Sequence, residues 1–235
     1  DFVTIATAGN AQDFGDLTQN TYKGGAGTSN NTRAIHAGGN EPSFVTDIEF
    51  FTIATTGNGT DFGDLTDARG YQASLSNSVR GLNAGGYDGS GALNTIDFVI
   101  IATTGNAVDF GDMDQGRYYN RAVSSSVRGV IAGGTGDITG SPAMTSNMQY
   151  VTISSDGGSN DFGEMDFARN GLVPASNDTR GLLAAGYVNP AAVRDTKILF
   201  ITIPTTGNST NFGGLSEAQD QGAGINSPTR GVFAG

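Results

Sequence analysis

The stretch DFVIIATTGNAVDFGDM, from Asp97 to Met113, decides the fold because nearly the same words occur five times in this chain. The other copies read DFVTIATAGNAQDFGDL from Asp1, EFFTIATTGNGTDFGDL from Glu49, QYVTISSDGGSNDFGEM from Gln149 and LFITIPTTGNSTNFGGL from Leu199. A unit that recurs about every 50 residues is typical of a solenoid, a propeller or another array. The repeat therefore predicts an architecture more clearly than it predicts a ligand.

Two residue types keep constant positions in the repeat. A phenylalanine precedes a glycine at intervals of 48, 48, 52 and 50 residues, and an arginine precedes a short apolar run at intervals of 47, 48, 52 and 50. We predict that both sets are structural, with each phenylalanine packed between neighbouring units. The positions are Phe14, Phe62, Phe110, Phe162 and Phe212 for the first set, and Arg33, Arg80, Arg128, Arg180 and Arg230 for the second.

Composition indicates one β-rich domain that spans residues 1–235. The chain has 37 glycines, no cysteine and a net charge of −11, and no linker interrupts the repeat. Short runs of Thr, Ile, Val and Phe between Gly and Asn are typical of many strands joined by tight turns, so helix should be almost absent. Because the chain is acidic, we expect neither nucleic acid nor a membrane as partner, and no apolar run approaches the roughly 18 residues of a membrane helix.

The second and third units show the strand pattern most clearly. We predict antiparallel strands at 70–76, 80–85, 96–103 and 108–112, with Thr104-Gly105-Asn106 as a hairpin turn. In the third strand Phe98 and Val99 point to opposite faces, and both are apolar. A strand that is apolar on both faces is covered on both faces, so four-stranded sheets should stack one on another.

The two chain ends favour a closed ring over an open stack. The chain begins at Asp1 within the third strand of a unit and ends, at Arg230–Gly235, with the second. Pairing of these ends would remove the free edges. We therefore predict an all-β, five-bladed β-propeller with four antiparallel strands per blade, whose last blade is closed by two C-terminal and two N-terminal strands.

The segment RGLNAGGYDGSGALNTIDFVIIATTGNAVDFGDMDQGR, from Arg80 to Arg117, resembles the kelch repeat. Phe110 stands where kelch repeats usually carry Trp, and the Gly-Gly doublet is replaced by Ala185-Gly186 in the fourth unit. The kelch arginine that opens the next blade is matched by Arg69, Arg117 and Arg169, but Thr21 and Gln219 stand at the corresponding positions elsewhere. The resemblance covers all five units and implies a propeller, not a chemistry.

The wording ATTGNxxDFGDL is also similar to repeats in structural and tail-associated proteins of marine bacteriophages. This second resemblance implies a non-enzymatic structural or adhesion module of a larger virion or surface protein. We therefore expect a virion or extracellular location, and a host-surface glycan or other virion proteins as partners. The alternative that we carry forward is a lectin-like, glycan-binding propeller.

Several chemical readings of the repeat are weaker than structural ones. The DFG triplets lack the other kinase motifs, and the acidic pairs such as Asp109/Asp112 lack the dense oxygen ligands of a Ca²⁺ loop. His36 is the only histidine, so it makes neither a triad nor a metal site alone. Among the residues expected near the axis, Asp220 is the only carboxylate, whereas glycoside hydrolysis needs two. We expect no enzyme, no cofactor and no metal.

The ligand is expected on the face that varies between units. The loops between the second and third strands differ in length, and they share a face with the connections to the next unit. Those connections are rich in Tyr and Arg, whereas the opposite face carries the repetitive TTGN turns. Loop surfaces of this kind carry binding sites more often than uniform ones. Our candidate ligand-binding residues are Arg69, Tyr71, Gln72, Arg117, Tyr118, Tyr119, Arg169 and Asn170, and the same face includes Tyr22, Lys23 and Arg121.

Overall fold

The computed structural model describes residues 1–235 except 5, 20–23, 41 and 138–141. Its described part is all-β, with 22 strands in antiparallel sheets and no helix. Within this part, no helix is long and apolar enough to cross a membrane. The expected all-β class is confirmed.

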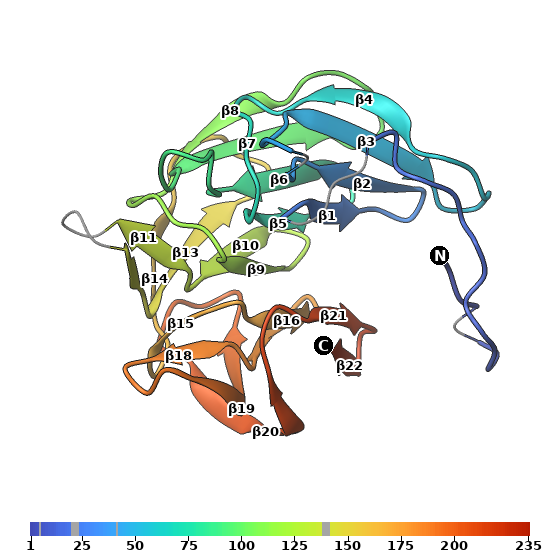
Figure 1. The fold of residues 1–235 in the computed structure, drawn as a ribbon. Helices are drawn as coiled ribbons and strands as arrows, with labels where there is room; N and C mark the ends of the chain where they lie inside the picture. Colours follow the sequence, from blue (N-terminus) through green and yellow to red (C-terminus); the bar gives the residue numbers. More distant parts are fainter. Residues whose placement is uncertain (5, 20–23, 41, 138–141) are drawn as a thin grey trace.

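Four sheets repeat one strand plan, and each strand pairs with its sequence neighbour in the sheet (Figure 1). Sheet 1 contains β1 (Ala26–Ser29), β2 (Arg33–Ala37), β3 (Asp47–Thr52) and β4 (Thr60–Asp64). Sheet 2 contains β5 (Ala73–Ser76), β6 (Arg80–Ala84), β7 (Thr95–Ile100) and β8 (Val108–Asp112). Sheet 3 contains β9 (Arg121–Ser124), β10 (Arg128–Ala132), β13 (Asn147–Thr152) and β14 (Asn160–Glu164). Sheet 4 contains β16 (Val173–Ser176), β17 (Arg180–Ala184), β19 (Val193–Thr202) and β20 (Thr210–Gln219).

The remaining strands are short. β21 (Ala223–Asn226) and β22 (Gly231–Ala234) form the two-stranded sheet 5. Sheet 4 is widened by β15 (Ala168–Asn170) and β18 (Tyr187–Asn189), and a separate hairpin joins β11 (Thr135–Asp137) to β12 (Pro142–Met144). The first strands of successive sheets, β1, β5, β9, β16 and β21, are neighbours in turn, so the five sheets follow one another about a common centre (Figure 1).

The DFG triplets explain how the sheets attach to one another. The carbonyl of Phe62 accepts a hydrogen bond of 2.7 Å from the N–H of Gly105 in the turn of the next sheet. A Cβ at Gly63 would collide with that turn, and its φ of 144° lies outside the range that other residues adopt readily. The same hydrogen bond joins Phe14 to Gly57, Phe110 to Gly157 and Phe162 to Gly207, each at 2.7 Å. Glycine at this position therefore permits close contact between sheets.

Four of the five repeated arginines lie over aromatic rings of their own sheets. The Arg33 guanidinium is 4.3 Å from the centre of the Phe50 ring, and Arg80 is 4.1 Å from that of Phe98. Arg128 over Tyr150 and Arg180 over Phe200 repeat the arrangement at 4.2 and 5.0 Å. This cation–π contact shields the ring of the third strand while the charge remains partly hydrated.

The core lies between the sheets, as the doubly apolar third strand predicts. Ile96, Phe98 and Val99 are all buried, although Phe98 and Val99 lie on opposite faces of β7. The phenylalanines of the fourth strands fill the same layers, and Phe62, Phe110 and Phe162 are 1 to 3% exposed. The end units differ, because Phe212 remains 53% exposed.

Two predicted strand boundaries are wrong for a local reason. The strand expected at 70–76 begins only at Ala73, because Tyr71 has a φ of 61° and interrupts the extended chain. The strand expected at 96–103 ends at Ile100, where the Thr103 N–H bonds the Ile100 carbonyl in a turn. The strand expected at 80–85 is observed at 80–84, and the strand at 108–112 lies where the sequence predicts it.

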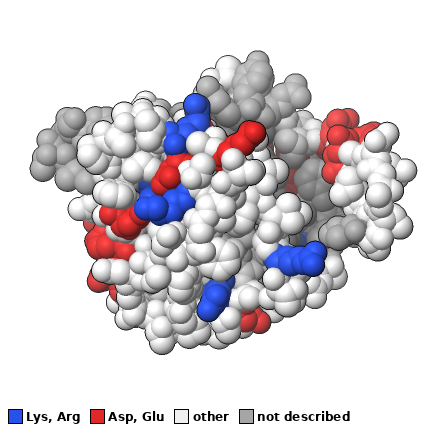
Figure 2. Space-filling view, turned by 90° about the horizontal axis from the view of Figure 1, so that it is seen from below, with Lys and Arg blue, Asp and Glu red and all other residues white. Residues whose placement is uncertain are grey.

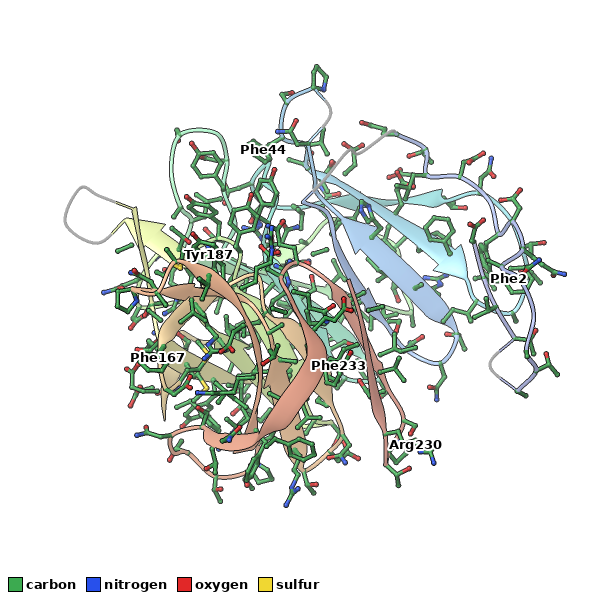
Figure 3. All side chains as sticks on the ribbon, turned by 60° about the horizontal axis from the view of Figure 1, so that its bottom comes forward. Phe2, Phe44, Phe167, Tyr187, Arg230 and Phe233 are labelled. Atoms are coloured by element: carbon green, nitrogen blue, oxygen red, sulfur yellow. The ribbon has the colours of Figure 1, made fainter. Side chains whose placement is uncertain are left out.

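The chain ends differ from the predicted closing sheet. Sheet 5 has two strands, and among the described residues of the segment Asp1–Leu17 none pairs with β22. The segment is instead held by sheet 1, because Phe14 and Asp16 accept hydrogen bonds from Gly57 and Gly59. In Figure 3, Phe2 on this segment and Arg230 beside β22 lie well apart. The four-stranded closing sheet is therefore not formed in this structure.

Candidate ligand-binding surface

The site is built on five residues with left-handed backbone at the entrance to the first strands. They occupy one position of the repeat: Gly24, Tyr71, Tyr119, Gly171 and Gln221, with φ between 55° and 85°. Hydrogen bonds link them in order, from Tyr71 N–H to Gly24 C=O (2.7 Å), Tyr119 to Tyr71 (2.9 Å), Gly171 to Tyr119 (3.0 Å) and Gln221 to Gly171 (2.7 Å). Three of the five carry side chains, and left-handed backbone is costly for a residue such as tyrosine. This axial chain of hydrogen bonds fixes where those side chains lie.

Five aromatic side chains form a closed circuit on the loop-bearing face. Phe44 contacts Tyr71 and Tyr87, with ring centroids 6.1 and 5.7 Å apart. Tyr71 contacts Tyr119 at 4.5 Å, Tyr119 contacts Tyr118 at 5.2 Å, and Tyr118 contacts Tyr87 at 5.2 Å. All five are half-buried. We call this set the aromatic ring.

The loops and the connections expected to share a face do contact each other. Gly70 and Tyr87 exchange backbone hydrogen bonds of 3.0 and 2.8 Å, and Tyr118 and Thr135 do so at 2.9 and 2.7 Å. The Asn170 side chain donates a 2.8 Å hydrogen bond to the Thr135 hydroxyl. These bridges hold the aromatic ring against the sheets. They also bring Asn170 close to Tyr118.

The Tyr118 hydroxyl of this surface is held in its protonated form, because its pKa is raised. Burial raises the pKa of Tyr118, and the neighbouring Tyr119 and Tyr87 raise it further. The Tyr87 hydroxyl donates to the carbonyl of Gly89 at 3.1 Å. The surface therefore presents aromatic faces with polar edges, a combination that suits partly hydrated contacts.

The structure corrects the assignment of three arginines to this surface. Arg69, Arg117 and Arg169 are 0, 2 and 0% exposed. Arg69 pairs with the equally buried Asp97 at 2.7 Å, and Arg169 pairs with Asp166 at 2.6 Å. Arg117 donates to Asp114 and to the Asn147 carbonyl, and burial lowers its pKa. All three hold one sheet against the next, so they belong to the packing and offer no donors to a surface ligand.

An axial cavity of about 650 Å³ lies where the first strands meet. All five sheets contribute to its lining, most of which is glycine or alanine, and Gln72 and Arg121 are among its polar residues. Gln72 is buried and donates to the Ala37 carbonyl at 2.9 Å. Tyr71 and Tyr119 belong both to this lining and to the aromatic ring. The two features therefore adjoin.

The structure thus brings Tyr71, Tyr118 and Tyr119 together, places Gln72 in the axial cavity, and leaves Asn170 beside the ring. Phe44 and Tyr87 complete the circuit. The sequence analysis does not predict them as ligand-binding residues, because each stands in a loop whose length and content differ between units. The signal that could have found them is an aromatic residue in a loop between the second and third strands. Tyr22 and Lys23 lie outside the described residues.

Several basic groups elsewhere form ion pairs with acidic side chains. Figure 2 shows one side of the molecule that is mostly uncharged and on which several blue groups touch red ones. Lys197 pairs with Asp166, and Arg80 with Asp156. In the described part of the chain, no three His, Cys, Asp or Glu side chains are grouped so that they could hold a metal ion.

Comparison with known proteins adds a likeness of fold. No protein-family model matches the chain, and no curated protein matches it. Among the solved structures, that of YjhT is similar with a TM-score of 0.76 and 13% sequence identity. The match covers 92% of this chain and 73% of the YjhT chain. At this identity the likeness shows a shared fold and carries no statement about ligand or activity.

Proposed function

We propose that the chain is a non-enzymatic, five-bladed β-propeller that serves as an adhesion module and binds its ligand at the aromatic ring. Two parts of this proposal need support: the closed ring of five blades, and the binding role. The axial chain of hydrogen bonds supports the first part. It has five members and four bonds, and a fifth bond from the Gly24 N–H to the Gln221 carbonyl would complete a circle.

The register at the two chain ends also supports closure. Phe2 bridges to Gln12 as Phe50 does to Thr60, one repeat later. The Phe2 and Phe14 rings meet edge to face at 5.9 Å, close to the 6.1 Å of the next unit. The N-terminal segment thus has the geometry of third and fourth strands.

Sheet 5 provides the residues with which this N-terminal segment would pair. By the pairing of Leu82 with Phe98, Val232 should oppose Phe2, and Arg230 should lie over the Phe2 ring. Val232 is 56% exposed in the open arrangement. Closure would bury this side chain together with the exposed Phe212, which apolar burial favours by roughly 25 cal/mol per Å².

Closure can be tested by a disulfide, because the chain has no cysteine of its own. Paired strand positions bring Cβ atoms to about 4.5–5.5 Å, near disulfide distance. The double variant Phe2→Cys with Val232→Cys should oxidise to an intramolecular bond, whereas Ile53→Cys with Val232→Cys should not. Linkage between two chains instead of within one would indicate exchange between copies, and no linkage of either kind would refute the closed ring.

The aromatic ring is the observation that carries the binding role. Its five side chains come from four separate connections between strands, so the surface is assembled by the fold and is not specified by one local stretch of sequence. Half-buried tyrosines offer a large contact area with little loss of conformational freedom. Aromatic faces with polar edges fit the apolar faces of sugar rings, so the lectin-like alternative becomes the preferred chemistry within the adhesion role.

A second candidate is a purely structural propeller within a virion, whose aromatic ring packs against another virion protein. Its support is the similarity of the repeated wording to structural proteins of marine bacteriophages. A packing role predicts that the ring is covered in the assembled particle. A lectin role predicts that it is free to bind sugar.

A glycan array with the isolated protein separates the two candidates. Tyr118→Ala should abolish binding to any glycan that the wild type retains, while Phe167→Ala should not. Phe167 is a suitable control because its ring is 50% exposed and lies away from Phe44 (Figure 3). Glycan binding that survives Tyr118→Ala would exclude the aromatic ring as the site. Complete absence of glycan binding would leave the structural role.

A further inference from the structure

Arg121 is the unusual residue of the axial cavity. It is the first residue of β9, and the other first strands begin with the small side chains of Ala26, Ala73, Val173 and Ala223. Among the described lining residues Arg121 is the only one that carries a charge. A small residue would fill this position as it does in the other sheets. The guanidinium therefore calls for an explanation beyond packing.

The charge of Arg121 is incompletely compensated. Its Nη1 donates a 2.9 Å hydrogen bond to the carbonyl of Asn120, and burial lowers the pKa of its guanidinium. Within the described part of the chain, no carboxylate lies within 4.0 Å of it, whereas Arg69, Arg117 and Arg169 each have one. A desolvated cation without a counter-ion is unfavourable, and an anion in the cavity would stabilise it.

We propose that the axial cavity binds a small monocarboxylate through Arg121. A guanidinium presents a planar fork that matches a carboxylate with two parallel hydrogen bonds. One cation balances one negative charge, and the net charge of −11 disfavours a dianion. The chemistry of the cavity thus selects a carboxylate over phosphate.

A second polar group narrows the ligand further. The side-chain oxygen of Gln72 is buried, and no hydrogen-bond partner is present for it in the described residues. Gln72 lines the same cavity as Arg121, and its amide nitrogen is already bonded to Ala37. An oxygen acceptor of this kind is satisfied by a hydroxyl donor. The ligand class is therefore a hydroxycarboxylate, with the Tyr71 ring as an apolar wall.

The inference goes beyond the proposed function, since it concerns the cavity and not the sugar-stacking surface. It is tested by NMR titration of ¹⁵N-labelled protein at constant ionic strength with glycolate, acetamide and inorganic phosphate. Glycolate should shift the amides of Gly25, Gly27 and Arg121 in a saturable way. Neutral acetamide should not, and neither should inorganic phosphate at a pH above its second ionisation, where it is mainly the dianion.

Three arginine variants give the decisive comparison. Arg121→Gln should weaken glycolate binding at least about tenfold, the lower range for loss of a charge-assisted pair. Arg121→Lys keeps the charge without the planar fork, so its affinity for glycolate should lie between those of the wild type and Arg121→Gln. This intermediate affinity would show that the loss in Arg121→Gln is not caused by misfolding. Arg180→Gln removes the same charge from the ring of Phe200, outside the lining of the cavity, and should change nothing.

Each other outcome overturns the proposal. Saturation by phosphate in preference to glycolate, unchanged glycolate affinity in Arg121→Gln, or no saturable shift with glycolate would each do so. Tyr118→Ala disrupts the aromatic ring but leaves Arg121, so it should bind glycolate normally. Failure of the glycan-binding proposal and failure of this one are thereby distinguishable.

Discussion

Replacement of Asp97 by alanine should be among the most destabilising changes in the molecule. Its side chain is 0% exposed and pairs with the equally buried Arg69 at 2.7 Å. It also accepts hydrogen bonds from the amide and hydroxyl of Thr66, at 3.1 and 2.8 Å. Asp97→Ala would leave the Arg69 charge buried without its closest carboxylate. Removing one partner of a buried pair costs about 3–5 kcal/mol, a large share of the 5–15 kcal/mol typical of a domain.

Urea unfolding of Asp97→Ala and four comparison variants tests this reasoning. Asp67→Ala is the matched control, because Asp67 is 49% exposed and lies 4.0 Å from Arg69, so its loss should cost at most about 1 kcal/mol. Arg69→Met combined with Asp97→Leu removes both charges, and it should be more stable than the sum of the two single changes predicts. A cost for Asp97→Ala no greater than that of Asp67→Ala, or strict additivity in the double variant, would refute the argument.

Three further predictions follow from local geometry. Burial lowers the pKa of His36 below 6.5, so the unfolded chain binds more protons than the folded chain as the pH falls through that value. The free energy of unfolding should therefore decline below about pH 6.5. His36→Gln should flatten this part of the pH profile when stability is measured by urea unfolding. Gln221→Gly should raise the melting temperature, because a φ of 58° costs a residue other than glycine on the order of 1 kcal/mol. An unchanged melting temperature would show that contacts of the Gln221 side chain offset this cost. Gly111→Ala should lower the melting temperature strongly, since its Cβ would meet the backbone of Gly157. A Cβ at Gly91 meets nothing, so Gly91→Ala should leave the melting temperature nearly unchanged when both variants are measured by calorimetry.

The strand plan could be predicted from sequence because its determinants are local and repeated. The TTGN turn and the flanking apolar runs specify a hairpin, and β3–β4, β7–β8 and β19–β20 follow that pattern. The left-handed conformation of Tyr71 could not be foreseen, since tyrosine rarely adopts it. What fixes it is the hydrogen bond to Gly24 in the preceding sheet, a contact between separate units.

The site could be predicted only in part for a similar reason. Tyr118 and Tyr119 lie beside the loop residue Tyr87, as the alternation of strands predicts. Arginine is rarely fully buried, so the sequence predicts Arg69, Arg117 and Arg169 at the surface. Their burial depends on carboxylates and carbonyls that the packing of whole sheets brings to them. A single sequence gives no sign of such contacts, because they join residues that are far apart in the chain.

Closure of the ring and ligand binding in the axial cavity are expected to be coupled. Gly24 and Gln221 stand on the two sides of the unformed hydrogen bond, and both line the cavity that contains Arg121. A ligand that contacts both sides binds the closed ring better than the open one, and it therefore stabilises closure by RT ln(1 + [L]/Kd) relative to the open form. Glycolate should then speed formation of the disulfide in the Phe2→Cys, Val232→Cys variant. It should not do so when Arg121→Gln is added, because the coupling passes through the carboxylate. A rate that is the same with and without glycolate would show that closure of the ring and ligand binding in the cavity are independent.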